Sequence, residues 1–304
     1  MKMELNYYEL EPEDNTFPEV VADITHRCNM TCRNCYIPNR DVPDMDIDRL
    51  IDCVSRFPKR IMIRLIGAEP TMRKDLPDII RRIRAAGHRV VVLSNGLRLA
   101  RKSYAQELRN AGLRHCYISL NGVDNDDWYE EIDELRCATK KVQALENMRD
   151  VKFTIDVGCI LVKGCNDEAP ARMLKLMDEK GIQNCVMRFK NIGQIGRYID
   201  VPNWTLDELI GVVAEQVGVT KDYIYSWQNS WADRESEVEP DSFYFPVGHD
   251  GKSFHRYGRW IKIVNWDVTG KVTPLSNRKT RGRITPDFKV APFFEHVKLN
   301  EGGY

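Results

Sequence analysis

The sequence predicts an α/β protein built on a partial (β/α)6 barrel of the TIM type, with a C-terminal α+β extension. Short runs rich in β-branched residues alternate with longer amphipathic runs from residue 19 to about residue 190. This alternation is the sequence form of repeated βα units. The short runs are also nearly continuously apolar, as expected of parallel strands that helices cover, and repeated crossovers of one hand curl such a sheet towards a barrel.

Six strands are expected in this array. They are "EVVADIT" (19–25), "RIMIRLIG" (60–67), "HRVVVLSNG" (88–96), "LRHCYISLNG" (113–122), "VKFTIDVGCILV" (151–162) and "NCVMRFKN" (184–191). The segments between them have helical spacing, for example Leu76, Ile79 and Ile83. Gly87 and Gly181 stand where two of these helices are expected to end. Polar, glycine-containing segments follow the strands, so they are expected on one rim of the barrel, where such folds carry their chemistry.

We divide the chain into an N-terminal extension (1–18), the barrel core (19–200) and a C-terminal extension (201–304). The last part begins with a capped helix at "NWTLDELIGVVAEQVG" and continues with hairpin signals at "GHDGKS" and "DVTGKV". We expect this helix and the β-rich segment after it to cover the barrel mouth.

The composition predicts a cytoplasmic protein without a membrane partner. Lys+Arg and Asp+Glu are both 45, so there is no overall electrostatic attraction to nucleic acid or a membrane surface. No apolar run approaches the roughly 20 residues of a membrane span, and the first residues lack the pattern of a signal peptide. An odd number of cysteines, nine, indicates reduced thiols with metal or redox chemistry rather than a disulfide framework.

Three of the cysteines, Cys28, Cys32 and Cys35, form a C-x3-C-x2-C motif after the first expected strand. Thiolates this close repel one another unless a cation shares their charge, and sulfur ligands select zinc or an iron–sulfur cluster. Zinc needs a fourth ligand, for which His26 is the local candidate. Three thiolates alone suit a cluster of four irons with one iron left open. The other six cysteines are scattered, mostly in apolar stretches where cysteine is usually a small buried hydrophobe.

The motif, placed after the first strand of a βα array, resembles that of the radical S-adenosylmethionine (SAM) superfamily. The resemblance implies that Cys28, Cys32 and Cys35 hold a [4Fe–4S] cluster whose open iron is chelated by SAM. It also implies that the reduced cluster cleaves SAM to a 5′-deoxyadenosyl radical, with an electron from a reductant such as flavodoxin or ferredoxin. A structural zinc-binding interaction protein is the alternative from another functional class.

The segment "LIGAEP" resembles the Gly-Gly-Glu-Pro segment of the same superfamily. The resemblance implies that Gly67, Ala68 and Glu69 receive the methionine ammonium of SAM, with Ala68 in place of the usual second glycine. Glu69 offers a charge-assisted acceptor, and Gly67 allows the backbone to approach a ligand. The alternative is that Glu69 is a solvated acid in a loop.

Four further residues that contact SAM are implied by the resemblance. In "ISLNG", Ser119 and Asn121 are candidates for the ribose hydroxyls, and alternation places them on the same side of the strand; an ordinary strand end and turn is the alternative. Ser94 of "SNG" borders SAM or the substrate. The family's aromatic residue usually precedes the third cysteine, where this chain has Asn34, so Tyr36 is the candidate for adenine contact.

Arg188 is a candidate for the SAM carboxylate or for an acidic group of the substrate, because its guanidinium offers a rigid bidentate fork. The alternative is that it pairs with a nearby acid. Cys159 and Cys165 are chemically able to donate a hydrogen atom, with buried packing as the alternative. Around them, residues 156–168 resemble the branch of molybdenum-cofactor cyclase and the SPASM/Twitch peptide maturases. No cysteine follows Cys185, so a single cluster is expected.

The substrate is predicted from a basic segment, Arg278–Arg283, which favours a small polar or nucleotide-like molecule. Abstraction of a hydrogen atom from it would lead to isomerisation, oxidation or rearrangement. A solvated basic loop is the other interpretation of this segment. A ribosomally made peptide and a nucleic acid remain as alternative substrates.

Overall fold

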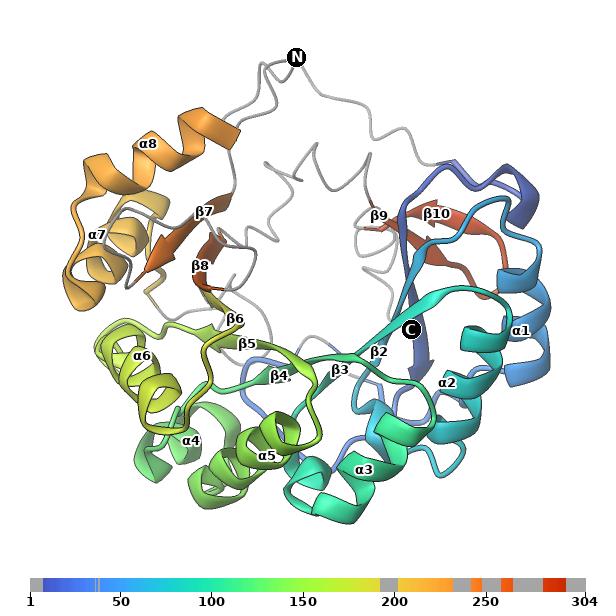
Figure 1. The fold of residues 1–304 in the computed structure, drawn as a ribbon, viewed down its shortest axis with the longest axis horizontal. Coiled ribbons are helices and arrows are strands. Elements are labelled where there is room, and N and C mark those ends of the chain that lie inside the picture. Colours follow the sequence, from blue (N-terminus) through green and yellow to red (C-terminus); the bar gives the residue numbers. More distant parts are fainter. Residues whose placement is uncertain are drawn as a thin grey trace.

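A single curved sheet of ten strands forms the centre of the computed structural model, which describes residues 8–35, 37, 39–191, 202–231, 242–247, 258–264 and 281–293. The strand order is β10-β9-β1-β2-β3-β4-β5-β6-β8-β7. Figure 1 shows the sheet curling into an arc with the helices on its outside, and β7 and β10 at the two ends of the arc. The sheet is therefore an open barrel, which confirms the predicted fold class.

All six expected strands of the core are confirmed. They are β1 (Glu19–Thr25), β2 (Met62–Gly67), β3 (Arg89–Ser94), β4 (His115–Ser119), β5 (Thr154–Ile160) and β6 (Cys185–Lys190). Each pairs in parallel with the next. Because the six run in one direction, the loops that follow them meet at one edge of the sheet, here called the carboxyl edge.

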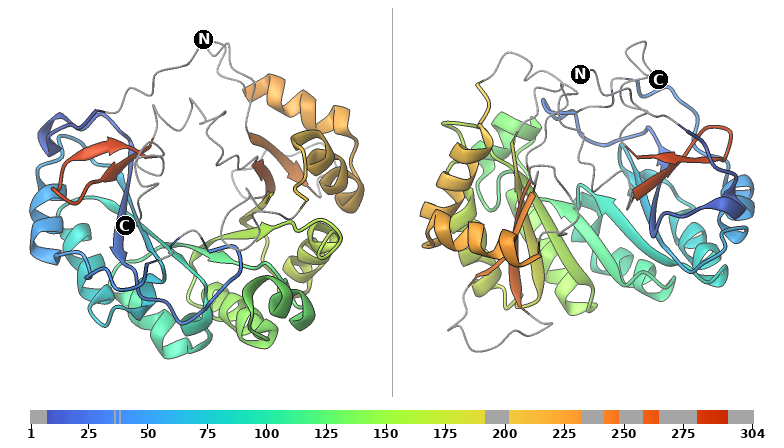
Figure 2. Two further views of the ribbon diagram at one scale, coloured as in Figure 1. Left: turned by 180° about the vertical axis from the view of Figure 1, so that it is seen from behind. Right: turned by 90° about the horizontal axis from the view of Figure 1, so that it is seen from above.

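The outer face of the sheet is covered by helices, as Figure 2 also shows from above. They are α1 (Ile47–Ser55), α2 (Leu76–Ala85), α3 (Lys102–Asn110), α4 (Asp126–Asp133), α5 (Ala138–Asp150) and α6 (Ala169–Glu179), with short 3-10 helices η1 (Pro12–Asp14), η2 (Pro70–Met72) and η3 (Leu97–Ala100). Gly87 and Gly181 follow α2 and α6 with φ of 96° and 64°, which confirms the predicted helix ends.

Strand alternation separates the two faces of the sheet. Val20, Ala22 and Ile24 of β1 belong to the hydrophobic core that the sheet forms with the helices. The residues between them, Glu19 and Asp23 among these, project to the opposite side because successive side chains of a strand alternate. The other strands repeat this pattern, so the side away from the helices is here called the inner face.

The C-terminal extension contributes α7 (Leu206–Val217), α8 (Lys221–Trp231), β7 (Ser242–Val247), β8 (Arg259–Val264), β9 (Arg281–Ile284) and β10 (Val290–Pro292). The expected capped helix is α7, with a capping box between Thr205 and Glu208. The predicted turns "GHDGKS" and "DVTGKV" and the boundary at residue 200 lie outside the described residues. In the described ranges no helix has both the length and the hydropathy of a membrane span.

The strands of this extension lengthen the core sheet at both edges. β8 pairs in parallel with β6, and β7 pairs antiparallel with β8 as a hairpin. β9 pairs in parallel with β1, and β10 pairs antiparallel with β9. Seen from behind, β9 and β10 lie beside β1 while α7 and α8 lie at the other end of the arc (Figure 2). The inner face therefore includes side chains from both ends of the chain.

Candidate active site at the carboxyl edge of the sheet

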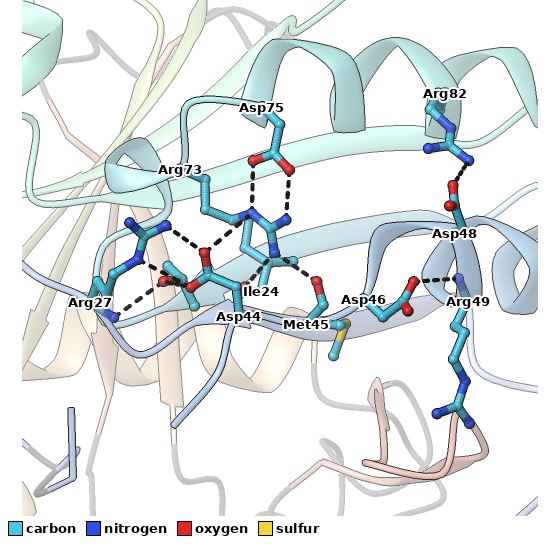
Figure 3. Close-up of polar contacts among 11 residues, drawn as sticks. Ile24, Arg27, Asp44, Met45, Asp46, Asp48, Arg49, Arg73, Asp75 and Arg82 are labelled. Carbon is cyan, nitrogen blue, oxygen red and sulfur yellow. Dashed lines mark hydrogen bonds and ion pairs between the residues drawn. The ribbon is translucent and has the colours of Figure 1, made fainter. Parts of the chain in front are cut away.

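The loop that carries the three cysteines connects β1 to α1, and its two ends are tied together. Met45 donates its backbone N–H to the carbonyl oxygen of Ile24 at 3.1 Å. The Thr25 hydroxyl donates to the Asp44 carboxylate at 2.5 Å, and Arg27 forms an ion pair with the same carboxylate. These contacts close the loop at its base (Figure 3).

Arg73, which follows η2, fixes this base to the rest of the sheet. Its Nη1 donates to the carbonyl oxygens of Ile24 and Met45, both at 2.8 Å. Its Nε and Nη2 bind both oxygens of Asp75 at 2.9 and 2.7 Å. Arg73 is buried, so these bonds replace the water that its guanidinium has lost, although the Asp75 carboxylate is half-exposed. Figure 3 shows that the guanidinium lies between the two ends of the loop.

The middle of the cysteine loop docks on the end of α4. The backbone N–H of Arg33 donates to the carbonyl oxygen of Ile132 at 3.1 Å, and the Arg33 side chain pairs with Glu131 at 2.5 Å and Glu134 at 3.5 Å. Within the loop, Cys35 donates its N–H to the carbonyl oxygen of Cys32 at 3.2 Å. The loop is therefore positioned at its base and at its tip.

The three thiols are half-buried, and N–H donors lie beside two of them. Arg40 Nη2 is 3.0 Å from Cys35 Sγ, and Asn95 Nδ2 is 3.9 Å from Cys28 Sγ. Donors and positive charge beside a thiol stabilise its thiolate, which is the form that binds metal. Burial raises the pKa of Cys28. Metal binding must therefore displace a proton that is held more tightly than in a free thiol.

The pKa of Cys32 is raised strongly, first because of burial and then because the Asp133 carboxylate lies beside it. Lys141 opposes this effect. The side chain of Lys141 is fully buried, and its Nζ donates to the carbonyl oxygens of Asn95 at 2.5 Å and Ser119 at 2.9 Å. Its positive charge thus lies under the loops that follow β3 and β4, and it favours thiolate formation at Cys32.

Glu69 is fully buried at the end of β2, so its interpretation as a solvated loop acid is wrong. Its Oε1 accepts hydrogen bonds from Thr71 N at 3.0 Å, Thr71 Oγ1 at 2.5 Å and Ser94 Oγ at 2.8 Å. Its Oε2 accepts from Asn95 N at 2.6 Å. The carboxylate thus joins the ends of β2 and β3, and Oε2 keeps a lone pair for one further donor.

Gly67 is required by the packing of the sheet itself. Its φ is +131°, and a Cβ at this position would lie 2.2 Å from the carbonyl oxygen of Thr25. The next residue, Ala68, donates its N–H to that oxygen at 2.8 Å. The close approach at Gly67 is therefore between the ends of β1 and β2, whereas the sequence suggested an approach to a ligand.

Ser119 and Asn121 do not lie on one continuous strand, because β4 ends at Ser119. Ser119 is half-buried on the inner face. Asn121 is buried in the turn that follows, where its Oδ1 accepts from Ile160 N at 3.0 Å and its Nδ2 donates to Asp133 Oδ1 at 2.8 Å. The expected alternation is therefore wrong for Asn121, whose side chain connects the ends of β4 and β5.

The structure also places the two candidate hydrogen donors, Cys159 and Cys165, and the candidate anion ligand Arg188. Cys159 is fully buried on the outer face, and its Sγ is 3.6 Å from the carbonyl oxygen of Asn121. Cys165 is half-buried, with its pKa raised to about 11 by burial. Both positions fit the packing alternative. Arg188 lies on the inner face and donates from Nη2 to Asp156 at 2.7 Å, so its pairing with an acid is confirmed. Tyr36 lies outside the described residues.

The donors of this loop fit an iron–sulfur cluster. In the described part of the chain, no three His, Cys, Asp or Glu side chains converge on the position of a single metal ion. His26, the proposed zinc ligand, has its ring Nδ1 3.1 Å from the carbonyl oxygen of Asn39. Three thiols on one loop suit a cluster, because each thiolate binds a separate iron.

Sequence reasoning missed Arg40, Arg73, Lys141 and Asp133. The first two are arginines in loops, and Lys141 stands next to another lysine on an amphipathic helix, where a solvated position is the usual expectation. Asp133 is the last residue of the acidic helix α4, where a solvated position is also the usual expectation. Nothing local in the sequence distinguishes these residues from surface charges, so only their burial and partners identify them.

Comparison with known proteins gives matches in both sequence and structure. The model of the radical SAM superfamily matches residues 23–177. The Fe-coproporphyrin III synthase of Methanosarcina barkeri is 35% identical over 112 residues, covering 35% of this chain and 28% of that protein. The probable GTP 3′,8-cyclase of Metallosphaera sedula is 30% identical over 166 residues, covering 52% and 51%. The chain thus spans about half or less of the length of these two relatives.

Two groups of solved structures share the fold. Streptococcus suis SuiB bound to its precursor peptide SuiA has a TM-score of 0.63 at 12% identity, covering 95% of this chain and 62% of SuiB. Native anSMEcpe with bound AdoMet and the Kp18Cys peptide has a TM-score of 0.53 at 14% identity, covering 70% of this chain and 61% of anSMEcpe. At these identities the likeness concerns the fold alone.

Proposed function

The chain belongs to the radical SAM superfamily, whose enzymes use a [4Fe–4S] cluster and SAM, and on this premise we propose that Cys28, Cys32 and Cys35 hold the cluster. The observation that carries the proposal is the position of the three half-buried thiols. They lie on one loop at the carboxyl edge, beside the segments that follow β2 and β3. When bound, the cluster and SAM supply the one-electron cleavage that yields a 5′-deoxyadenosyl radical.

We propose that the neighbouring residues orient SAM. Glu69 is held rigidly by Thr71, Ser94 and Asn95, and its Oε2 retains acceptor capacity for the methionine ammonium. Ser119, which is half-buried on the inner face at the end of β4, would hydrogen-bond to a ribose hydroxyl of SAM. The support is that these groups end neighbouring parallel strands and so share one edge.

The substrate in this proposal is a small polar molecule from which one hydrogen atom is removed. An electron carrier such as flavodoxin or ferredoxin delivers the electron that cleaves SAM. The hydrogen atom taken from the substrate would end in 5′-deoxyadenosine, and the substrate radical would rearrange, or would be oxidised by passing one electron to the electron carrier. The protein's own contribution is to orient the two reactants and to exclude water.

The experiment is anaerobic reconstitution with iron and sulfide, followed by SAM and a chemical reductant. We expect a brown protein that releases 5′-deoxyadenosine, and we expect Cys32→Ala to lose this release almost entirely. Cys185→Ala is the matched control, because Cys185 is buried in the core and lies in β6. Full release of 5′-deoxyadenosine by Cys32→Ala would refute the assignment.

A peptide is the second candidate substrate, since SuiB, which shares the fold, is bound to a precursor peptide in its structure. A nucleic acid is the third. Each candidate substrate, a peptide, a nucleic acid or a small polar molecule, is added separately to the reconstituted enzyme. The true substrate class is the one that increases the release of 5′-deoxyadenosine. A nucleic acid would in addition bind with a steep dependence on salt concentration.

A further inference from the structure

Tyr117 of β4 carries a phenol on the inner face of the sheet. Its neighbours in the strand, Cys116 and Ile118, belong to the core that packs on the helices, so alternation turns Tyr117 to the opposite side. Only 9% of the residue is exposed. A buried tyrosine hydroxyl usually has a hydrogen-bond partner, but none of the described residues provides one for Tyr117. Its O–H group is therefore not used by the fold.

The ring of Tyr117 leans towards the carboxyl edge. Tyr117 stands opposite Asp156 of β5, yet its hydroxyl lies over Gly158, two residues nearer that edge. A Cβ added at Gly158 would overlap the hydroxyl oxygen, so the glycine makes room for the phenol. Gly158 is in register with Ser119, the last residue of β4, and paired strands are about 4.8 Å apart. The hydroxyl therefore lies at the level of Ser119, the residue assigned above to the ribose of SAM.

The surroundings of the ring keep this hydroxyl protonated. Burial raises the pKa of Tyr117, and the Arg188 guanidinium, 5.4 Å from the ring centroid, offsets only part of that effect. At neutral pH the phenol thus holds its hydrogen. A phenolic O–H bond is weaker than an aliphatic C–H bond, so a carbon-centred radical can take the hydrogen atom directly.

Other described side chains that could give up a hydrogen atom lie elsewhere, apart from the thiols assigned to the cluster. Cys159 is buried on the outer face, and Cys165 packs against a small apolar cluster. Tyr244 of β7 also projects from the inner face, but its ring stacks on Trp260 with 4.6 Å between the centroids, and three strands separate β7 from β4. Tyr117 is thus the hydrogen-bearing group nearest to the end of β4.

We propose that Tyr117 is the hydrogen-atom donor of the site and that its hydroxyl gives a hydrogen atom to the carbon-centred product radical. This inference rests on the proposed function and concerns its rearrangement branch, in which the product radical needs a hydrogen atom. A C–H bond forms on the product as the Tyr117 O–H bond breaks homolytically, which leaves a neutral tyrosyl radical. One electron from the electron carrier and one proton from water then restore the phenol.

The test is a reaction of the reconstituted protein in heavy water with SAM and a chemical reductant, without added substrate. The hydroxyl hydrogen of Tyr117 exchanges with the solvent, whereas hydrogens on carbon do not. A 5′-deoxyadenosine molecule that takes its hydrogen atom from Tyr117 therefore carries one deuterium. Mass spectrometry measures the deuterated fraction of the released 5′-deoxyadenosine, whatever the rate of release. We expect mainly deuterated product from the wild type and loss of the deuterium in Tyr117→Phe.

Tyr104→Phe is the matched control for this measurement. Tyr104 is also a buried tyrosine whose hydroxyl has no partner among the described residues, but it belongs to the core between the sheet and the helices. Its variant should give the same deuterated fraction as the wild type. Gly158→Ala is a second test variant, because it keeps the phenol of Tyr117 but displaces the hydroxyl. We expect it to lower the deuterated fraction as well.

Electron paramagnetic resonance of the wild type gives a readout that does not depend on the folding of any variant. With one equivalent of reductant, the tyrosyl radical is not reduced again, and we expect its signal in samples frozen during the reaction. The hyperfine splitting should change when the protein is made with ring-deuterated tyrosine.

Three results would overturn the inference and leave the proposed function standing. They are release of 5′-deoxyadenosine without deuterium by the wild type, deuterium that persists in Tyr117→Phe, and a wild type that releases 5′-deoxyadenosine without a tyrosyl signal. No release of 5′-deoxyadenosine by the wild type would instead reject the proposed function, and this inference with it.

Discussion

At the scale of single residues, the positive charge of Arg40 is expected to affect the reduction potential of the cluster. Its Nη2 lies 3.0 Å from Cys35 Sγ, and its Nη1 reaches the carbonyl oxygen of His26 at 3.5 Å. Hydrogen bonds to the sulfurs and local charge set the reduction potential of an iron–sulfur cluster. Reduction adds negative charge, so a cation at this distance favours the reduced state.

We therefore expect Arg40→Met to make the cluster harder to reduce. Loss of one charge-assisted hydrogen bond of about 1.5 kcal/mol corresponds to a shift of roughly 60 mV to more negative potential. Redox titration followed by electron paramagnetic resonance measures this shift. Arg81→Met is the control, because Arg81 pairs only with Asp78 on the surface of α2 in the described structure. An unchanged or more positive potential in Arg40→Met would contradict the assignment.

The lowered pKa of Lys190 predicts that the free energy of unfolding depends on pH. Its pKa of about 8 in the folded protein is below that of an unfolded lysine, about 10.4. The folded state therefore disfavours the ammonium form, and this penalty is fully present below pH 8 and disappears as the pH rises through about 10.4. In a buffer without phosphate, Lys190→Met should be more stable than the wild type at pH 7, by on the order of 1 kcal/mol.

Urea unfolding at pH 7 and pH 10 measures this difference, which should shrink at the higher pH. Lys175→Met is the control, since its exposed side chain should give no such dependence. If Lys190→Met were less stable than the wild type at pH 7, the ammonium would be stabilising the fold, contrary to the lowered pKa.

At the scale of elements, Arg73 connects β1, the cysteine loop and the start of α2. Its guanidinium satisfies two backbone carbonyls and both oxygens of Asp75 (Figure 3). Arg73→Met would remove the donor to the Met45 carbonyl oxygen and to the half-exposed Asp75 carboxylate, and one of the two donors to the Ile24 carbonyl oxygen. We expect the free energy of unfolding to fall by about 1–3 kcal/mol, the cost of leaving a buried acceptor unpaired, and the assembled cluster to be lost faster to a chelator.

Arg82→Met is the matched control for this prediction. Arg82 also joins two elements, α2 and α1, through a 2.7 Å contact with Asp48 (Figure 3). However, the Asp48 side chain is almost fully exposed. Surface pairs of this kind contribute between about 0 and 1 kcal/mol. Chemical denaturation and the rate of bleaching in chelator distinguish the two variants. Similar effects of both would mean that Arg73 has no special role in holding the loop.

At the scale of the whole molecule, the open sheet depends on β9 lying beside β1. Gly282 of β9 stands opposite Val20, and a Cβ at Gly282 would lie 2.6 Å from the ring of Phe17 and 2.8 Å from Val290. Gly282→Ala should therefore force these neighbours apart and lower the stability by about 1–3 kcal/mol. Amide hydrogen exchange along β1 should become faster.

Gly211→Ala is the comparison variant, and we expect it to raise the stability instead of lowering it. Gly211 lies inside α7, where the added methyl group would meet only the flexible end of Lys221. Replacement of a helical glycine by alanine gains up to about 1 kcal/mol. Differential scanning calorimetry should thus give a lower melting temperature for Gly282→Ala and a higher one for Gly211→Ala. A neutral Gly282→Ala would show that β9 is not held tightly against Phe17.

By itself, the sequence determined the six strands of the core, the ends of two helices and the three-cysteine motif, because these depend on the residues next to them. The tertiary structure decided which side chains share a site. It placed Glu69 and Lys141 in the interior and brought Arg281 beside Glu19. Such pairings join residues far apart in the chain, and the free energy that selects them comes from burial and from charge. Neither of these leaves a local periodicity that can be read from the sequence.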